Sequence, residues 1–449
     1  MGTYRLESVV KFLRAFSIAV PADGPHRSRS QVRHDWLTTV FFVRDEPYPP
    51  LGGPALRNWQ NILACSRHGP VLVICTVPGK RRTVSLNDRV TIKYYGSGRT
   101  WPLSDARGWW LGRTLYRAYN LLSRSIGERL LCRLMRRDIC AFQPMLAIFE
   151  EYKCAEFLPS IAGLPITTVY DAHNVEAALQ KSLAGGRLET PTVFSREGRT
   201  ILRERKLASA VDQIWVCSEL EKIHAAEHLR PTCDVRVIPN TIEPSQYANA
   251  YSGNSRSATN DVFNLIFCGS FCYLPNLEAA DLLIKEIFPG IADVLPQARL
   301  ILVGRDPPAS MIKAARHDPR ITIAGSVPDP AEYLGRSHIC IVPLRKGGGT
   351  RLKILEAFAS GCPVISTRKG AEGLSVTDGK HLLFAETAAE FVTATMRLWQ
   401  DPSLRRSIIS QAYSLVIAEY STDSGWQQLE KALDELESVG GRGRAAISA

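Results

Sequence analysis

The residues of this chain that are best suited to chemistry lie in one segment, where a run of glycines precedes two cations and a carboxylate. The glycine loop consists of Gly347, Gly348 and Gly349, and the polar residues after it are Thr350, Arg351, Lys353 and Glu356. The N–H groups of such a loop, the positive end of a helix dipole and two side-chain cations together suit an anion. A carboxylate further along the helix suits hydroxyl groups. The pattern therefore predicts a site for a molecule with both phosphates and hydroxyls, such as a nucleotide sugar.

A strand before this loop and a helix after it are expected to position these side chains. Ile339–Leu344 is an apolar run typical of a buried strand, and Thr350 is expected to cap the helix by accepting a backbone N–H. Gly361 is typical of the residue just after a helix, and Pro363–Ser366 predicts the next strand. Glycine-rich turns also occur as plain structural loops in parallel α/β proteins, but a plain turn has no use for the cations and the carboxylate.

This segment closely resembles the donor-binding signature of retaining glycosyltransferases with the GT-B fold, the group 1 or family 4 enzymes. In that family a Glu-x7-Glu pair flanks the helix, and its first glutamate contacts the sugar while its second contacts the ribose of the nucleotide. Glu356 matches the second glutamate, whereas Gly348 stands where the first would be. The Gly-Gly-Gly-Thr-Arg-Leu-Lys version is similar to a subgroup often associated with surface-polysaccharide assembly. The resemblance implies a nucleotide-sugar donor, and the missing carboxylate leaves its sugar open.

The C-terminal half alternates buried apolar strands with helices, which predicts a parallel, doubly wound sheet. Leu265–Cys268 is expected to be its first strand, with a helix over Leu277–Phe288 after it, and Arg299–Gly304 is the next strand and turn. These strands resemble those of the family's C-terminal domain, so the resemblance places Gly304 beside the donor. The segment Val237–Ile242 resembles the family's linker between its two domains.

The turn after the first of these strands departs from the family. It contains Gly269 and Ser270, and many members carry an arginine at the position of Ser270 and a lysine several residues later. Both of those cations serve the pyrophosphate. This chain has neither, so Arg351 and Lys353 are expected to reach the same anion from the opposite loop.

The N-terminal half is expected to form a second Rossmann-like domain. Its first unit is a strand, a glycine loop, a helix and a second strand: Leu37–Val43, Gly52 and Gly53, the helix with Arg57, and Pro70–Val77. The loop resembles the first loop of the family, which lies against the donor and the acceptor. The resemblance therefore places Gly52, Gly53 and Arg57 in the cleft near the acceptor, although an ordinary turn would explain the Gly-Gly pair equally well.

An Asp-Ala-His-Asn segment ends another predicted strand. It contains His173 and Asn174, and Glu150 ends the preceding strand. The segment resembles the Asp-x-His-Asn-x-Glu segment of the family, which implies that His173 hydrogen-bonds the acceptor or the donor sugar near the reacting carbon. Glu150 is a second catalytic candidate, and a purely structural role for His173 stays open. Ser218 is expected to cap a helix over Glu219–His228 rather than to act in the cleft.

Size and composition agree with a two-domain globular protein. The chain has 449 residues, of which 45% are hydrophobic, enough to bury two cores. Its 11 cysteines are scattered without the spacing of metal ligands, so neither a disulfide framework nor a zinc site is expected, and a reducing, cytoplasmic compartment follows. No stretch of 18 apolar residues is present, so no segment is expected to span a membrane.

Positive charge is concentrated in the N-terminal half. Residues 1–240 hold 34 Lys and Arg against 22 Asp and Glu, a net charge of +12, while the remaining residues have a net charge of −1. Much of the excess lies in Arg99–Arg137, where nine arginines are interleaved with tryptophan and leucine. This pattern suits an anionic membrane surface, which would place the protein on the inner face of a membrane. A solvated basic face is the alternative, and nucleic acid is not expected because no recognition motif is present.

The fold class expected is α/β, with two Rossmann-like domains of the GT-B type whose parallel sheets face each other across a cleft. The chain divides into an extension (1–35), an N-terminal acceptor domain (36–240), a linker (241–260), a C-terminal donor domain (261–420), a helix that packs back on the N-terminal domain (421–439) and a disordered tail (440–449).

The resemblance implies transfer of a sugar from a UDP- or GDP-linked donor to a glycan or lipid-linked acceptor, with retention of configuration. No cofactor and no metal ion are expected, because the cations of the donor loop would stabilise the leaving nucleotide. Two alternatives stay open. One is a catalytically silent relative that binds membranes or glycans as a scaffold, and the other is a nucleotide-sugar epimerase of the same architecture.

Overall fold

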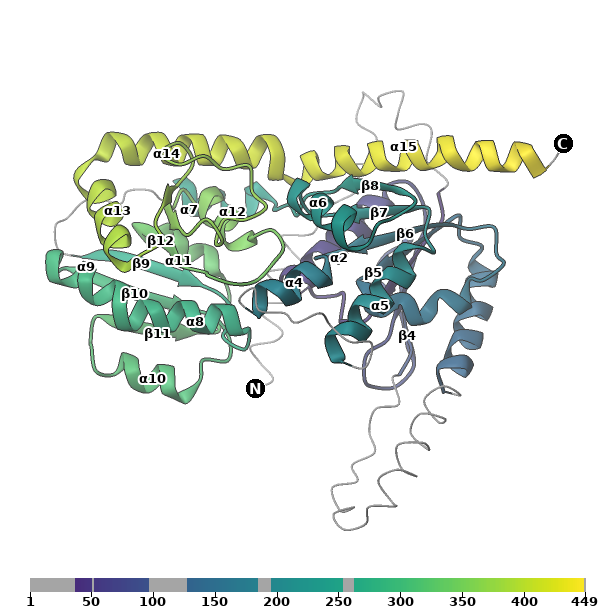
Figure 1. The fold of residues 1–449 in the computed structure, drawn as a ribbon, viewed down its shortest axis with the longest axis horizontal. Coiled ribbons are helices and arrows are strands. Elements are labelled where there is room, and N and C mark those ends of the chain that lie inside the picture. Colours follow the sequence, from purple (N-terminus) through teal and green to yellow (C-terminus); the bar gives the residue numbers. More distant parts are fainter. Residues whose placement is uncertain (1–36, 51, 97–126, 185–194, 253–261, 448–449) are drawn as a thin grey trace, which may run out of the picture.

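The computed structural model describes residues 37–50, 52–96, 127–184, 195–252 and 262–447. They form two α/β halves, each built around one mainly parallel sheet, and a helix at the C-terminal end runs across to the N-terminal half (Figure 1). The two Rossmann-like domains expected from the sequence are thereby confirmed. The N-terminal extension and residues 97–126, which hold most of the Arg99–Arg137 region, lie outside the described residues.

The N-terminal sheet has eight strands in the order β3-β4-β2-β1-β5-β6-β7-β8, and all neighbours are parallel except β3 and β4. The strands are β1 (Thr39–Val43), β2 (Val71–Cys75), β3 (Arg82–Ser85), β4 (Val90–Tyr94), β5 (Leu146–Glu150), β6 (Thr167–Ala172), β7 (Gln213–Val216) and β8 (Asp234–Val237). The strands β1, β2 and β5 are buried along their whole length. Their nearly continuous apolar sequence follows from that burial, because a central parallel strand is covered on both faces.

Helices cover both faces of this sheet. They are α2 (Gly53–Ser66), a helix over residues 127–142, the 3₁₀ helix η1 (Tyr152–Ser160), α4 (Glu176–Leu183), α5 (Arg196–Ala208) and α6 (Glu219–His228). The hydroxyl of Ser218 accepts a hydrogen bond from the N–H of Glu221, so its predicted role as the cap of α6 is confirmed. Two apolar clusters fill the two faces of the sheet.

The C-terminal sheet is fully parallel, with six strands in the order β11-β10-β9-β12-β13-β14. The strands are β9 (Phe263–Cys268), β10 (Ala298–Val303), β11 (Ile321–Gly325), β12 (Ile339–Val342), β13 (Val364–Ser366) and β14 (Leu383–Phe384). The surrounding helices are α8 (Leu274–Leu282), η3 (Leu283–Ile287), α9 (Phe288–Val294), α10 (Ala309–Ala315), α11 (Pro330–Arg336), α12 (Leu352–Ala359) and α13 (Ala388–Gln400). Two short helices, η2 (Pro244–Tyr247) and α7 (Ala248–Ser252), precede the sheet.

Two helix starts differ from the sequence-based expectations. The helix expected over Leu277–Phe288 begins at Leu274 and continues through α8, η3 and α9 to Val294, because Pro275 fits the first turn of a helix. The helix after the glycine loop begins at Leu352, so Thr350 is not its cap. The Thr350 hydroxyl instead donates to the Cys217 carbonyl in the other domain, at 3.2 Å.

The chain ends in three consecutive helical segments, α14 (Pro402–Leu415), the π-helical η4 (Val416–Tyr420) and α15 (Thr422–Ile447). Leu429 and Leu433 of α15 belong to the apolar cluster of the N-terminal sheet, so α15 packs on that domain (Figure 1). The backbone stays helical to Ile447, whereas the sequence interpretation expected a disordered tail from residue 440. No helix in the described parts of the chain combines the length and the apolar character needed to cross a bilayer.

Candidate functional site

Loops at the carboxyl ends of strands from both domains meet between the two sheets. Asn174, after β6, lies against the glycine loop after β12: Cβ atoms placed on Gly348 and Gly349 would be 3.0 and 2.7 Å from its Oδ1. Ser182 of α4 donates a hydrogen bond to the Gly347 carbonyl at 3.0 Å. A side chain on Gly348 or Gly349 would therefore push against Asn174 where the two domains meet.

The predicted first loop of the N-terminal domain reaches the same place. Gly52 has φ 94°, in the region that glycine adopts without strain, and it precedes α2. A Cβ placed on Gly53 would lie 3.6 Å from Leu352 Cδ1, at the start of α12. The structure therefore brings Gly53 next to the start of α12, which follows the glycine loop of the other domain.

Arg57 differs from its predicted role, because its guanidinium is not available to an acceptor. It is buried on α2 and pairs with Asp171 at the end of β6, with Nε 2.9 Å from Oδ2 and Nη2 2.5 Å from Oδ1. Its Nη1 donates to the Ile238 carbonyl and to Asn240 Oδ1. Asn61 donates to the same carboxylate, at 2.7 Å. Arg57 thus ties the first helix to the strand that leads to His173 and to the segment that leaves the domain.

His173 lies between two carboxylates at the end of the sheet. Its Nε2 is 3.0 Å from Glu150 Oε2, and its Nδ1 is 3.6 Å from Glu151 Oε1. One side-chain amide atom of Asn58 lies 2.7 Å from His173 Nε2, 2.9 Å from Glu150 Oε2 and 3.0 Å from the Pro54 carbonyl. Glu150 and His173 are therefore neighbours, as expected from the ends of adjacent parallel strands.

The electrostatics of this cluster favour a charged imidazole. Burial would lower the pKa of His173, but Glu150 and Glu151 outweigh it and raise the pKa to about 10. Burial and Asp171 raise the pKa of Glu150 to about 8, against the opposing effect of His173. The pKa of Glu151 falls to about 2, because His173 and Lys153 outweigh its burial. Glu151 is therefore the carboxylate whose charge is present at every physiological pH.

Glu150, Asp171 and His173 offer ligand atoms within 4.8 Å of one another, which is compatible with the size of a metal site. Both oxygens of Asp171 are already engaged by Arg57 and Asn61. A fixed guanidinium in the cluster would repel a cation. The residues therefore do not fit a metal ion at this position.

Arg351 is the principal cation at the glycine loop. It is only 7% exposed, and its Nη1 donates to the Gly348 carbonyl at 2.6 Å. Its Nε and Nη2 atoms have no hydrogen-bond partner among the described residues. Gly347 and Gly349 have φ values of 110° and 71°, which let the loop wrap around this side chain. Two buried donors of a guanidinium are thus left for a ligand to satisfy.

Lys353 and Glu356 lie deeper along α12. Lys353 Nζ donates to Asn276 Oδ1 at 2.7 Å, and burial together with the nearby Arg351 lowers its pKa to about 8. Glu356 accepts a hydrogen bond from the Tyr247 hydroxyl at 3.4 Å, and burial raises its pKa. Both groups are charged side chains held in a poorly solvated environment.

The turn after β9, which contains Gly269 and Ser270, packs against the side chain of Lys353. A Cβ on Gly269 would lie 2.9 Å from Lys353 Nζ, and a Cβ on Gly304 would overlap the Gly269 carbonyl. The backbone of the turn at Gly269 therefore packs directly on Gly304, where a side chain would not fit. The Ser270 hydroxyl accepts a hydrogen bond from Arg305 Nε at 3.1 Å. Sequence reasoning missed Arg305, which brings a cation to the position of Ser270 from the next strand.

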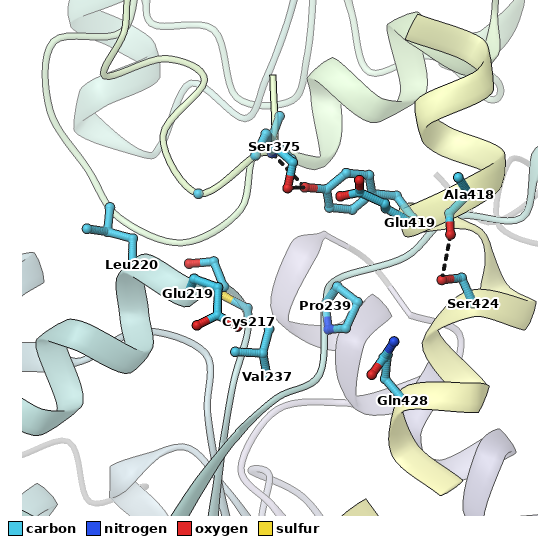
Figure 2. A pocket seen from close by; sticks show the side chains of 14 residues that line it. Cys217, Glu219, Leu220, Val237, Pro239, Ser375, Ala418, Glu419, Ser424 and Gln428 are labelled. Carbon is cyan, nitrogen blue, oxygen red and sulfur yellow. Dashed lines mark hydrogen bonds between the residues drawn. The ribbon is translucent and has the colours of Figure 1, made fainter. Parts of the chain in front are cut away.

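A separate cavity of about 500 Å³ lies where the chain passes between the domains (Figure 2). Its wall combines residues after β7, from α6, from the end of β8 and the segment after it, from the loop after β13, and from η4 and α15: Cys217, Ser218, Glu219, Leu220, Val237, Pro239, Gly373, Leu374, Ser375, Ala418, Glu419, Tyr420, Ser424 and Gln428. The predicted donor and catalytic residues are not among them, so this cavity is distinct from the site around Arg351 and His173.

Solved structures with the same two-domain arrangement show that the fold is the GT-B fold of glycosyltransferases. Sucrose-phosphate synthase from Thermosynechococcus elongatus has a TM-score of 0.68 and 16% identity, over 90% of this chain and 100% of that chain. The α,α-trehalose 6-phosphate synthase from Burkholderia multivorans has a TM-score of 0.64 and 12% identity, over 92% and 100%. HepE from Anabaena, solved in complex with UDP-glucose, has a TM-score of 0.59 and 14% identity, over 88% and 99%.

The sequence comparisons agree with this fold. Residues 262–401 match the family model of glycosyl transferases group 1. D-inositol 3-phosphate glycosyltransferase from Corynebacterium jeikeium (strain K411) is 24% identical over 295 residues, which are 61% of this chain and 68% of that protein.

Proposed function

We propose that this protein is a glycosyltransferase that moves a sugar from a UDP- or GDP-linked donor to a glycan or lipid-linked acceptor, with retention of configuration. The observation that carries the proposal is the guanidinium of Arg351, which is buried beside the glycine loop with two donors unpaired. Buried guanidinium donors without acceptors are costly, and a diphosphate would supply the missing acceptors.

The donor would lie along the start of α12. Its diphosphate would accept hydrogen bonds from Arg351, Lys353 and the N–H groups of the loop from Gly347 to Thr350. These groups would stabilise the charge that develops on the leaving nucleotide, so we infer that the reaction needs no metal ion. Glu356 would hold the ribose in place of its contact with Tyr247.

The acceptor would bind from the N-terminal side, near Gly52, Gly53 and Asn174. His173 and Glu150 would face the reacting carbon, with His173 acting as a donor of hydrogen bonds rather than as a base, because its pKa is raised. Transfer would occur on the face from which the nucleotide leaves, and we assign no protein nucleophile.

The solved structures support the donor class. HepE was solved with UDP, with UDP and glucose, and with UDP-glucose. The alternatives are a silent scaffold, which would not need the buried cations Arg351 and Lys353, and a nucleotide-sugar epimerase, for which the group 1 match of residues 262–401 offers no support.

A surface helix favours a membrane-linked acceptor. Over residues 127–142, Leu130 and Leu134 are 56% and 36% exposed, and they alternate with the exposed residues Arg129, Arg133 and Arg137. Apolar side chains between arginines suit the headgroup region of an anionic bilayer. We therefore place the protein in the cytoplasm, bound peripherally to the inner face of a membrane.

Calorimetric titration with UDP, GDP, ADP and CMP in the presence of EDTA tests the donor site. One nucleoside diphosphate should bind, and Arg351→Met should weaken it by at least about tenfold, because charge-assisted hydrogen bonds contribute about 1.5–3 kcal/mol. Arg336→Met is the control, because Arg336 is exposed and pairs with Glu332. Equal affinity of Arg351→Met and the unsubstituted protein would contradict the proposal.

A further inference from the structure

We propose that Glu151 is a positioning residue of the cleft, whose carboxylate holds the imidazole of His173 in its charged form with Nδ1–H presented to an oxygen of the bound substrate. This inference rests on the proposed function for the identity of that substrate. It depends on geometry that the sequence does not reveal, since Glu151 belongs to none of the motifs described above.

The backbone of Glu151 is the first observation. Its φ is 67° and its ψ is 153°, in a region that is almost exclusive to glycine. Its N–H donates to the Asp171 carbonyl at 3.1 Å, which continues the pairing of β5 with β6 and holds the strained conformation in place. A glycine would satisfy this turn with less strain, so the glutamate side chain needs another explanation.

The side chain supplies that explanation. Glu151 Oε1 is 3.6 Å from His173 Nδ1, which is an ion-pair distance but too long for a hydrogen bond. Lys153 Nζ is 2.9 Å from Oε2 and holds the carboxylate in this direction. His173 Nδ1 is buried and has no hydrogen-bond partner among the described residues. A hydroxyl or phosphate oxygen of a ligand could accept the hydrogen bond that Glu151 is too distant to accept.

Two carboxylates flank the imidazole of His173, and Glu151 is the one that faces its unpaired Nδ1. The groups that face the imidazole or its neighbours are Glu150 and Glu151 after β5, Asp171 of β6, Arg57 of α2, Lys153 of η1 and Cys217 after β7. Asp171 is paired with Arg57, although its charge still raises the pKa of Glu150 and of His173. Burial raises the pKa of Glu150, so its charge is lost first as the pH falls. Glu150 raises the pKa of His173 more strongly than Glu151 does, but Glu151 is the carboxylate that keeps its charge when Glu150 is protonated, and it faces Nδ1.

The test compares two substitutions of Glu151 with a matched control. Glu151→Gln removes the charge, and Glu151→Gly removes the side chain while suiting the backbone conformation. Glu156→Gln is the control, because Glu156 lies in the same segment, is exposed to a similar extent (23% against 18%) and pairs with Arg44 instead of facing His173.

The first readout needs no substrate. The full-length protein is labelled with ¹³C-histidine, the His173 signal is assigned with His173→Gln, and its titration is followed by NMR. In the unsubstituted protein and in Glu156→Gln, His173 should stay charged above pH 8. In both Glu151 variants its pKa should fall by at least about one unit, a tenfold loss of proton affinity. An unchanged titration in both variants would overturn the proposal.

The second readout separates this inference from the proposed function. Hydrolysis of UDP-glucose is measured against pH, and the alkaline limit of activity should move down in the Glu151 variants by the same amount as the NMR titration. If the alkaline limit of activity stays unchanged although the pKa of His173 falls, His173 Nδ1–H does not donate to the substrate, and that part of the proposal is wrong. If the unsubstituted protein binds and hydrolyses neither UDP-linked nor GDP-linked sugars, the donor assignment fails, and the NMR titration still decides whether Glu151 controls His173.

Discussion

The guanidinium of Arg57 and the carboxylate of Asp171 form a buried ion pair that joins the first helix of the N-terminal domain to the strand leading to His173. Their side chains are 2% and 0% exposed, and three hydrogen bonds connect them. Asn61 shares the carboxylate, and the Ile238 carbonyl shares the guanidinium. The pair therefore couples the geometry of the candidate catalytic cluster to the segment that leads into the second domain.

Removal of Arg57 should unfold the protein readily. Arg57→Met leaves Asp171 buried without its cation, and breaking a buried pair in this way costs about 3–5 kcal/mol of the free energy of unfolding. Urea unfolding measures the loss. Arg320→Met is the control, because Arg320 pairs with Asp318 near the surface, where such pairs contribute about 0–1 kcal/mol. Similar losses for both variants would show that the Arg57 pair has no special role.

The glycine at position 349 should be needed for ligand binding as well as for backbone conformation. Gly349 has φ 71°, and a Cβ there would lie 2.7 Å from Asn174 Oδ1. Gly379 has φ 69°, with nothing within 4 Å of its Cβ position. Both alanine variants should lose about 1 kcal/mol of stability. Only Gly349→Ala should also weaken UDP binding, by about tenfold or more, in a calorimetric titration; equal affinity of the two variants would contradict the fit of the two domains at this loop.

Nucleotide binding should weaken at alkaline pH because of Lys353. Burial and Arg351 lower the pKa of this amine to about 8, so above pH 8 an anionic ligand must bind together with a proton. The dissociation constant of UDP should rise by up to about tenfold per pH unit above 8. Lys353→Met should bind UDP more weakly and should lose this pH dependence. A dissociation constant that is flat from pH 7 to 9.5 in the unsubstituted protein would contradict the role of Lys353.

Glu204 should make the protein less stable as the pH rises. Burial raises its pKa from 4.5 to about 8 in the folded state, so between these values the folded state binds more protons than the unfolded state. The free energy of unfolding therefore falls as the pH increases through this window. Glu204→Gln should reduce this decline in urea unfolding measured at pH 5.5 and 8, and Glu332→Gln, at an exposed position, should not. Equal declines in the Glu204 variant and the unsubstituted protein would refute the assignment.

Exposed leucines should mediate the proposed membrane contact. The double variant Leu130→Ser and Leu134→Ser should bind phosphatidylglycerol vesicles at least about tenfold more weakly in sedimentation, because it removes two side chains that would be buried in the headgroup region. Ile223→Ser is the control, since Ile223 is 55% exposed on α6, outside the arginine-rich helix. Binding that is equal on phosphatidylcholine vesicles, or unaffected in the double variant, would exclude this surface.

Several features were predictable because they depend on residues close together in the chain. The glycine loop between β12 and α12, the cap at Ser218 and the turn at Gly361 (φ 66°) follow from local steric and hydrogen-bonding preferences. Alternating apolar strands and helices then indicated two parallel sheets, because both faces of such strands must be covered. The GT-B fold and the position of the glycine loop between a strand and a helix were therefore accessible from the sequence.

The partners of the site side chains depended on the tertiary structure. Arg57 and Asp171 are separated by 114 residues, and Thr350 and Cys217 by 133, so no local preference could pair them. The strained backbone of Glu151 is stabilised by a carbonyl of β6, which accepts its N–H. The sequence by itself determined which elements form and where cations, carboxylates and glycines follow strands. Tertiary packing decided which of these groups face one another, because burial and long-range hydrogen bonds select partners by their position in space rather than along the chain.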